Sequence, residues 1–305
     1  MKTWYAGTYT GTGSEGIYRF TLENEPELLC KIKNPKYICH HQDKIAAVCD
    51  FDNGAGAALI SKEGEILDTI TFEQRTSCYI GSDGKYLYTA NFHEGTFTVL
   101  KVENNHLSLK ETVHIQDGGG CHQVLVYKDR LLVPCLFLDR IMMFERETLK
   151  PLGSIRFNTG TGPRHGVFSH DGKYLYLVSE LSNELFVIST DTWEILSEQP
   201  VLTSGELHVR GGAAIRLSND GKYLYASTRG KDVLSVFTAD GDKVQLVDNV
   251  SCGGKHPRDF NIDENYLLCA NRFSNEISVF PLSDGKIGEE ALRIPVTEAV
   301  SLIGE

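Results

Sequence analysis

Asp83-Gly84-Lys85-Tyr86-Leu87-Tyr88 is the most informative stretch of this 305-residue sequence, because the same six residues occur three times. They recur at 171–176 and 220–225, and weaker copies begin at residues 43, 128 and 263. The first apolar residue after each turn recurs at intervals of 41 to 49 residues, and one interval back from Ile45 lies an apolar run at Trp4. The chain therefore contains seven tandem repeats.

Each repeat has the composition of four short β-strands. In the fourth repeat, apolar and β-prone segments cover residues 121–127, 131–136, 141–144 and 149–157, with short polar links between them. Asp-Gly between two such segments is a strong signal for a β-hairpin. Four strands in a repeat of about 44 residues are typical of a propeller blade. We predict an all-β fold, in which residues 1–305 form a single seven-bladed β-propeller with four antiparallel strands per blade.

The two ends of the chain predict how the ring closes. The first repeat begins at its second strand and lacks an innermost one, whereas the last repeat continues into an extra apolar segment at 298–303. That segment can join the first blade as its missing strand and cover an open sheet edge. The alternative is a frayed C-terminal tail.

Composition limits the partners and the compartment. The formal net charge of −11 argues against nucleic acid and anionic membranes, but it leaves room for a small anionic ligand in a locally basic cavity. No stretch reaches 18 apolar residues and the first residues lack a signal-peptide core, so we expect a cytoplasmic protein. None of the eight cysteines forms a CxxC pair, so we expect reduced, mostly buried thiols. The oligomeric state is left open.

Polar side chains gather at two positions of the repeat. The innermost strand of a blade begins, and the antiparallel second strand ends, at the same mouth of the central channel. Ligand sites commonly form at such strand ends. The candidate site residues at these positions are His122, Arg164, His165, Glu180, Arg229, Arg258, Asn271 and Arg272. Such residues suit an anion site with an acid/base group, although arginines at blade junctions also serve as purely structural ion-pair partners.

These features resemble the seven-bladed propeller lactonases, a family that includes bacterial propeller-type 6-phosphogluconolactonases and fungal carboxymuconate-lactonising enzymes. The segments that carry the resemblance are Gly7-Thr8-Tyr9-Thr10, Gly162-Pro163-Arg164-His165, Ser179-Glu180-Leu181, Ser227-Thr228-Arg229-Gly230, His256-Pro257-Arg258-Asp259-Phe260 and Ala270-Asn271-Arg272. The resemblance implies hydrolysis of a sugar-acid lactone, 6-phosphogluconolactone of the oxidative pentose phosphate pathway, without a metal. In muconate-type relatives a His, Arg, Glu, Arg set is implicated, and the matching residues are His122, Arg164, Glu180 and Arg229.

Lactone opening requires an activated water and a donor or cation for the developing oxyanion. Our hypothesis is that His165 or His122 is the base, oriented by Glu180, and that Arg164 stabilises the oxyanion. A phosphate would be held by a further arginine at the mouth, namely Arg229, Arg258 or Arg272. No His, Asp or Glu set has metal-ligand spacing, so neither a metal nor another cofactor is expected.

Two other functions fit the same fold. A non-catalytic propeller would bind a protein or a glycan on one face, and it predicts an exposed apolar or aromatic patch. A lactonising isomerase would act on a muconate, and its dicarboxylate would also favour arginines. Residue types alone do not separate this isomerase from a lactone hydrolase.

Overall fold

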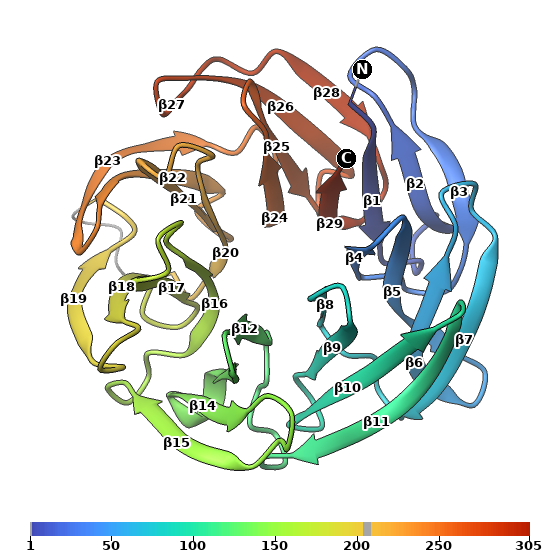
Figure 1. The fold of residues 1–305 in the computed structure, drawn as a ribbon. Helices are drawn as coiled ribbons and strands as arrows, with labels where there is room; N and C mark the ends of the chain where they lie inside the picture. Colours follow the sequence, from blue (N-terminus) through green and yellow to red (C-terminus); the bar gives the residue numbers. More distant parts are fainter. Residues whose placement is uncertain (1, 204–208) are drawn as a thin grey trace.

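The computed structural model describes residues 2–203 and 209–305, and these residues form a ring of seven antiparallel sheets (Figure 1). The ring confirms the prediction of a seven-bladed β-propeller. Each blade has an innermost strand beside the central channel and three strands that step outward. The seventh blade differs slightly, because its outer edge is divided between two short strands that both pair with the third strand.

Within each blade the strands follow one another outward from the channel in chain order, except that the C-terminal strand is innermost in blade 1. Blade 1 consists of β29 (Ala299–Gly304), β1 (Trp4–Thr8), β2 (Gly16–Phe20) and β3 (Glu27–Lys31). Blade 2 consists of β4 (Tyr37–His41), β5 (Lys44–Phe51), β6 (Gly54–Ile60) and β7 (Ile66–Glu73). Blade 3 consists of β8 (Tyr79–Ser82), β9 (Tyr86–Asn91), β10 (Thr96–Glu103) and β11 (His106–His114). Blade 4 consists of β12 (Leu125–Tyr127), β13 (Arg130–Cys135), β14 (Arg140–Glu145) and β15 (Pro151–Arg156), and the short 3-10 helix η1 (Leu136–Leu138) lies between β13 and β14. Blade 5 consists of β16 (Pro163–Phe168), β17 (Tyr174–Ser179), β18 (Glu184–Ser189) and β19 (Ile195–Pro200). Blade 6 consists of β20 (Gly212–Leu217), β21 (Tyr223–Thr228), β22 (Val233–Asp240) and β23 (Lys243–Ser251). Blade 7 consists of β24 (Pro257–Ile262), β25 (Tyr266–Asn271), β26 (Glu276–Ser283), β27 (Lys286–Ile287) and β28 (Leu292–Pro295).

The last strand closes the ring, as the two chain ends predicted. β29 is the innermost strand of blade 1 and pairs antiparallel with β1, with Tyr5 opposite Ile303 and Ala6 opposite Leu302. Side chains then fix β29 between its neighbours, because the Ser301 hydroxyl accepts the amide of Ile38 (3.0 Å) from blade 2. The N- and C-terminal segments therefore lie in one sheet, and the ring has no open blade (Figure 1).

The repeated Asp-Gly segments form the turns between the innermost and the second strands. The Asp171 carboxylate accepts the amide of Lys173 (3.0 Å), and Gly172 adopts φ +71°, a left-handed conformation that suits glycine. In two of the three copies the second tyrosine then reaches the next blade, where Tyr176 donates to the carbonyl of Gly241 (2.7 Å). Tyr225 donates in the same way to Gly285 (3.1 Å). One short motif therefore builds a hairpin and also joins two blades.

The hydrophobic core lies between neighbouring blades. On β17, Tyr176 and Val178 pack toward blade 6, whereas Leu175 and Leu177 pack toward blade 4. Both faces of this strand are buried, because side chains alternate between the faces of a strand and each face meets another blade. This arrangement explains why the second strands are apolar at nearly every position.

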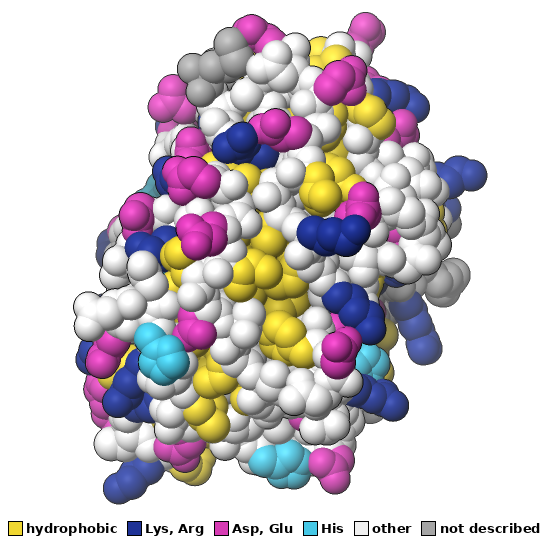
Figure 2. All heavy atoms as spheres, turned by 90° about the vertical axis from the view of Figure 1, so that its right-hand side faces the viewer, with side chains coloured by type: hydrophobic (Ala, Val, Ile, Leu, Met, Phe, Trp, Pro, Cys, Tyr) yellow, Lys and Arg dark blue, Asp and Glu magenta, His cyan; other side chains and the backbone are white. Residues whose placement is uncertain are grey.

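The outer surface of the ring carries mixed charges and scattered apolar side chains. Figure 2 shows the outer edges of the blades on the right of Figure 1, with acidic and basic groups interspersed around a narrow apolar strip. The exposed large apolar side chains of the outermost strands occur once per blade, at Leu28, Ile66, Leu109, Leu152, Leu196, Val247 and Leu292. They are thus distributed around the outer edge of the ring.

Two further sequence expectations concern cysteines and membranes. All eight cysteines are free thiols, and all except the half-buried Cys39 are buried. Within the described residues, no helix is long and apolar enough to cross a membrane.

Candidate functional site

We call the end of the channel at which the second strands finish the mouth. The opposite end carries the Asp-Gly turns, and we call it the turn face. The two halves of this mouth differ in chemistry. Phe51 ends β5, Phe92 directly follows β9 and Phe137 lies two residues after β13, so blades 2 to 4 present aromatic rings. The equivalent positions of blades 5 to 7 carry Glu180, Arg229 and Arg272.

A cavity of about 240 Å³ opens at this mouth, between the aromatic and the charged halves. The residues that line it are Tyr9, Lys36, Thr76, Cys78, Phe92, His93, His122, Glu180, Arg229 and Arg258. Four of the eight candidate residues chosen from the sequence are therefore in its wall: His122, Glu180, Arg229 and Arg258. The lining contains three cationic side chains against one carboxylate, so the cavity suits an anion although the protein is acidic overall.

Glu180 is held by two arginines. Its Oε2 accepts from Arg164 Nε at 2.8 Å and lies 2.9 Å from Arg229 Nη2. Burial alone raises the pKa of Glu180, but Arg164 and Arg229 outweigh it, and the net pKa lies below the usual 4.5. Burial and the nearby Arg164 lower the pKa of Arg229 to about 10, which still leaves it charged at neutral pH. The cavity thus contains an ionised carboxylate.

This geometry corrects two of our role assignments. Within the described part of the chain, the recorded partners of the Glu180 carboxylate are guanidinium groups, so it does not orient an imidazole. Arg164 is only 2% exposed, is absent from the cavity lining and donates through Nη1 to the carbonyl of Ala213 (2.5 Å). Arg164 therefore supports Glu180 from behind and is not placed to meet an oxyanion.

His122 and His165 form a buried imidazole pair. Nδ1 of His122 lies 3.1 Å from Nε2 of His165, and the ring centroids are 4.9 Å apart. His122 lines the cavity and His165 lies behind it, against the rings of Tyr37 and Tyr79. Burial and the charge of Arg164 lower the pKa of both imidazoles well below 6.5, so both are neutral at pH 7.

The three remaining candidates have different surroundings. Arg258 lines the cavity, and its guanidinium lies 5.6 Å from the ring centre of Tyr9. Arg272 pairs with Glu298 at 3.2 Å. The amide of Asn271 donates inside its own blade, to the carbonyl of Cys252 (2.9 Å) and the hydroxyl of Ser278 (3.0 Å). Arg258 therefore lies at the cavity. Arg272 and Asn271 are not among its lining residues and instead contact Glu298 and groups of blade 7.

A model of the family described as lactonase, 7-bladed β-propeller, matches residues 3–303 of the chain. The chain belongs to this family. Its relatives include a Bacillus subtilis protein named 6-phosphogluconolactonase, 28% identical with 90% of each chain covered. Among solved structures, a Lactobacillus plantarum protein has a TM-score of 0.94 at 29% identity, with both chains fully covered. A Bacteroides fragilis protein provisionally named a 6-phosphogluconolactonase has a TM-score of 0.89 at 27% identity, with 100% of this chain and 98% of that chain covered.

Sequence reasoning did not select some of the residues that line this cavity. Tyr9 directly follows β1, after Thr8, and therefore occupies the same mouth as Glu180 and Arg229. Lys36 precedes β4 and occupies an innermost-strand start. Both positions follow from the register rule that identified the other candidates, but the first blade begins at its second strand, which obscured Tyr9, and a lone lysine gave no signal.

Deeper in the channel lies an ion pair that the sequence analysis also missed. Arg216 Nη2 is 2.8 Å from Asp259 Oδ1, and the second oxygen of Asp259 accepts the amide of Leu302 (3.0 Å). Arg216 belongs to blade 6, Asp259 to blade 7 and Leu302 to the closing strand of blade 1. This ion pair connects three blades below the cavity. As for metals, residues 2–203 and 209–305 contain no cluster of three or more His, Cys, Asp or Glu side chains that could bind one.

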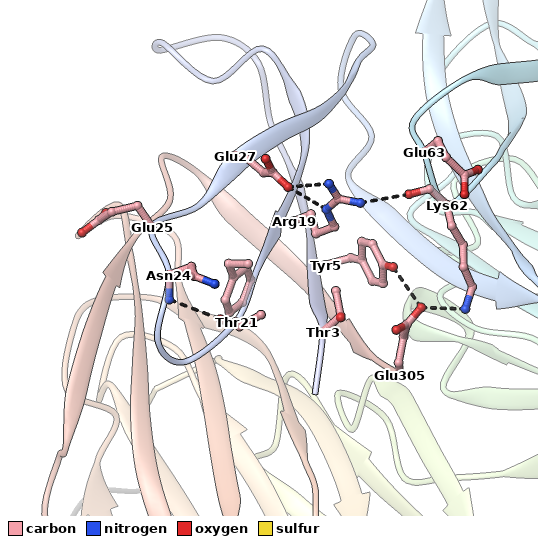
Figure 3. Close-up of a pocket in the computed structure, with 11 residues that line it drawn as sticks. Thr3, Tyr5, Arg19, Thr21, Asn24, Glu25, Glu27, Lys62, Glu63 and Glu305 are labelled. Carbon is pink, nitrogen blue, oxygen red and sulfur yellow. Dashed lines mark hydrogen bonds and ion pairs between the residues drawn. The ribbon is translucent and has the colours of Figure 1, made fainter. Parts of the chain in front are cut away.

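A second hollow of about 420 Å³ lies near the chain termini, between blades 1 and 2 (Figure 3). Four of its six charged groups pair with one another: Arg19 with Glu27 (2.5 Å), and Lys62 with Glu305 (2.6 Å), which also accepts the hydroxyl of Tyr5 (3.1 Å). Such exposed, mutually satisfied pairs offer little to a ligand. The cavity at the mouth is therefore the better candidate for the site of this lactonase-family protein.

Proposed function

We propose that this protein hydrolyses 6-phosphogluconolactone to 6-phosphogluconate. The observation that carries the proposal is one cavity bordered by a neutral imidazole, an ionised carboxylate and three cations. Membership of the lactonase family and the name of the Bacillus subtilis relative support the same reaction class and substrate.

In this proposal Glu180 positions the attacking water. The carboxylate accepts a proton from water as the oxygen adds to the lactone carbonyl carbon, which gives a tetrahedral intermediate with a negatively charged oxygen. His122 and Arg229 border the same cavity and stabilise that oxygen. The intermediate collapses when the bond between this carbon and the ring oxygen breaks. The proton held by Glu180 then passes to the ring oxygen, which becomes a hydroxyl group.

The imidazole pair supports a donor role for His122. Nδ1 of His165 is buried and has no hydrogen-bond partner among the described residues, whichever way the proton lies between the two rings. A buried N–H without an acceptor is rarer than an unused lone pair, and the charges of Arg164 and Arg216 near His165 favour the lone pair. His165 then carries its proton on Nε2 and donates to Nδ1 of His122. His122 in turn carries its proton on Nε2, the nitrogen left for the cavity.

A phosphorylated lactone also suits the compartment that we propose. Sugar phosphates are charged and remain inside the cell, where the oxidative pentose phosphate pathway would supply this lactone. Eight free thiols, seven of them buried, fit a reducing compartment such as the cytoplasm.

The proposal is tested by a hydrolysis assay with 6-phosphogluconolactone, gluconolactone and carboxymuconolactone, each corrected for spontaneous opening in buffer. We expect the largest acceleration with 6-phosphogluconolactone, and the same rate after treatment with a chelator. The His165→Ala variant reports whether the second imidazole is needed. Formation of a muconate from carboxymuconolactone would favour the isomerase, and no acceleration with any of the three lactones would overturn the proposal.

A further inference from the structure

Three cations surround one aromatic ring at the mouth. The guanidinium groups of Arg272 and Arg258 lie 4.2 Å and 5.6 Å from the ring centre of Tyr9, and the ammonium of Lys36 lies 5.9 Å from it. The ring faces of tyrosine attract cations, but the attraction is modest at a site open to solvent. Bringing three like charges to one ring therefore requires further compensation.

Only one of these three cations has an acidic partner. Arg272 pairs with Glu298 at 3.2 Å. Over residues 2–203 and 209–305, neither Lys36 nor Arg258 forms an ion pair with a carboxylate. The other half-buried or buried arginines near the channel are paired: Arg164 and Arg229 with Glu180, and Arg216 with Asp259. Lys36 and Arg258 are thus two half-buried cations that lack the counter-charge found for their neighbours.

Both cations border the same cavity as Glu180 and His122. Lys36 comes from the start of blade 2 and Arg258 from blade 7, so they approach the cavity from the two sides of blade 1, which carries Tyr9. The cavity is also open on the Lys36 side, because a groove of about 730 Å³ shares Lys36, Thr76 and His93 with it. An anionic group can therefore reach these cations from solvent.

We propose that Lys36 and Arg258 form a phosphate subsite beside Tyr9, and that this subsite gives the enzyme its preference for a phosphorylated lactone. The inference rests on the proposed function and specifies which cations hold the phosphate. Arg229 and Arg272 already pair with Glu180 and Glu298, whereas Lys36 and Arg258 have no carboxylate partner among the described residues. Two cations match a phosphate that is close to dianionic at pH 7. The lactone carbonyl, at the other end of the substrate, then faces Glu180 and His122.

The test compares Lys36→Met and Arg258→Met with Lys33→Met, a change on the adjoining groove that does not border the cavity. Methionine keeps an unbranched apolar chain while it removes the charge. We expect each cavity variant to raise KM for 6-phosphogluconolactone about 10- to 100-fold with little change in kcat, as the loss of a charge-assisted hydrogen bond predicts. KM for gluconolactone, which has no phosphate, should rise much less than KM for 6-phosphogluconolactone, and Lys33→Met should behave like the wild type. The conservative variant Lys36→Arg should restore most of the lost affinity.

Calorimetric titration with 6-phosphogluconate and with inorganic phosphate separates this proposal from the proposed reaction. A wild type that opens no lactone but binds 6-phosphogluconate, with affinity lost in Lys36→Met and Arg258→Met, would refute the reaction and support the subsite. Equal use of gluconolactone and 6-phosphogluconolactone by the wild type would refute the subsite. Unchanged 6-phosphogluconate binding in both variants, with unfolding temperatures like that of the wild type, would refute it as well.

Discussion

The two ends of the blades use their side chains in opposite ways. At the turn face, one motif recurs from blade to blade, and several of its polar groups are satisfied within the protein, as when Asp171 accepts a backbone amide and Tyr176 donates to Gly241. At the mouth, the equivalent positions differ from blade to blade, and several polar groups point into a cavity. His165 Nδ1 is buried and meets no hydrogen-bond partner in the part of the chain that the structure describes. Repetition at one end therefore builds the ring, and variation at the other end builds the site.

The difference also separates stability from activity. A change at the turn face removes a contact that holds two blades together, so it should lower stability and leave catalysis intact. A change of a cavity group at the mouth should lower catalytic activity and leave stability nearly unchanged. Substitutions of individual residues at the two ends test that separation.

Glu180→Gln should reduce kcat for lactone opening by about 10²- to 10⁴-fold, because an amide accepts a hydrogen bond but cannot take the proton of water. The amide oxygen still accepts from Arg164, so the folded state should persist. Steady-state kinetics and circular dichroism measure both effects. Glu184→Gln is the matched control, since Glu184 begins the next strand at the same end but does not border the cavity. Wild-type turnover in Glu180→Gln would exclude this carboxylate as the base.

His122→Leu should reduce kcat by about 10²- to 10³-fold, the usual cost of losing one donor to an oxyanion. His122→Gln should retain more activity than His122→Leu, because its side-chain amide offers an N–H near the position of Nε2. A base role predicts instead that both variants are equally impaired. Imidazole ¹⁵N chemical shifts of the wild type provide an independent measurement, with a proton expected on Nε2 of both His122 and His165.

Glu73 should make stability depend on pH. It is buried at the mouth end of β7, where it accepts from Ser77 and Asn91, and burial raises its pKa to about 7 from the usual 4.5. A carboxyl group with a raised pKa in the folded state stabilises below its unfolded pKa, and this contribution is lost as pH rises from about 4.5 through 7. Glu73→Gln should therefore gain about 3 kcal/mol of unfolding free energy relative to the wild type between pH 4.5 and pH 8. Urea titrations at several pH values measure the difference, and parallel pH curves would contradict the prediction.

Tyr176→Phe should lower the free energy of unfolding by about 1 kcal/mol, because it removes the hydrogen bond from blade 5 to Gly241 of blade 6. Tyr174→Phe removes the other tyrosine hydroxyl of the same motif, which forms no recorded hydrogen bond with residues 2–203 or 209–305, and should change stability less. Lactone turnover should be equal in both variants and the wild type. A loss of activity in Tyr176→Phe without a loss of stability would contradict the separation between the two ends.

Much of the fold could be predicted because its signals are local. Asp171 and Gly172 specify a hairpin wherever they occur, so counting such turns counts blades. The alternation of strand direction then places Glu180 and Arg229 at one mouth without knowledge of any contact. The divided outer edge of blade 7 and the short helix after Cys135 were not predicted, because outer strands and short connections have weak patterns.

The partners of the site residues could not be predicted in the same way. The sequence suggested that Glu180 orients a histidine, whereas the structure places it between two arginines. The partner of a side chain depends on distances between blades, and register within a blade does not supply them.

The sequence by itself thus determined the number of blades, the closure of the ring by its last residues and the end of the blades at which function is sought. Only the tertiary structure decided which of the charged groups there pair with a carboxylate and which lack such a partner among the described residues. Lys36 and Arg258 are more than 200 residues apart in the chain and meet beside Tyr9 because ring closure makes blades 7, 1 and 2 neighbours. A local pattern carries no record of a contact that exists only once the ring is closed.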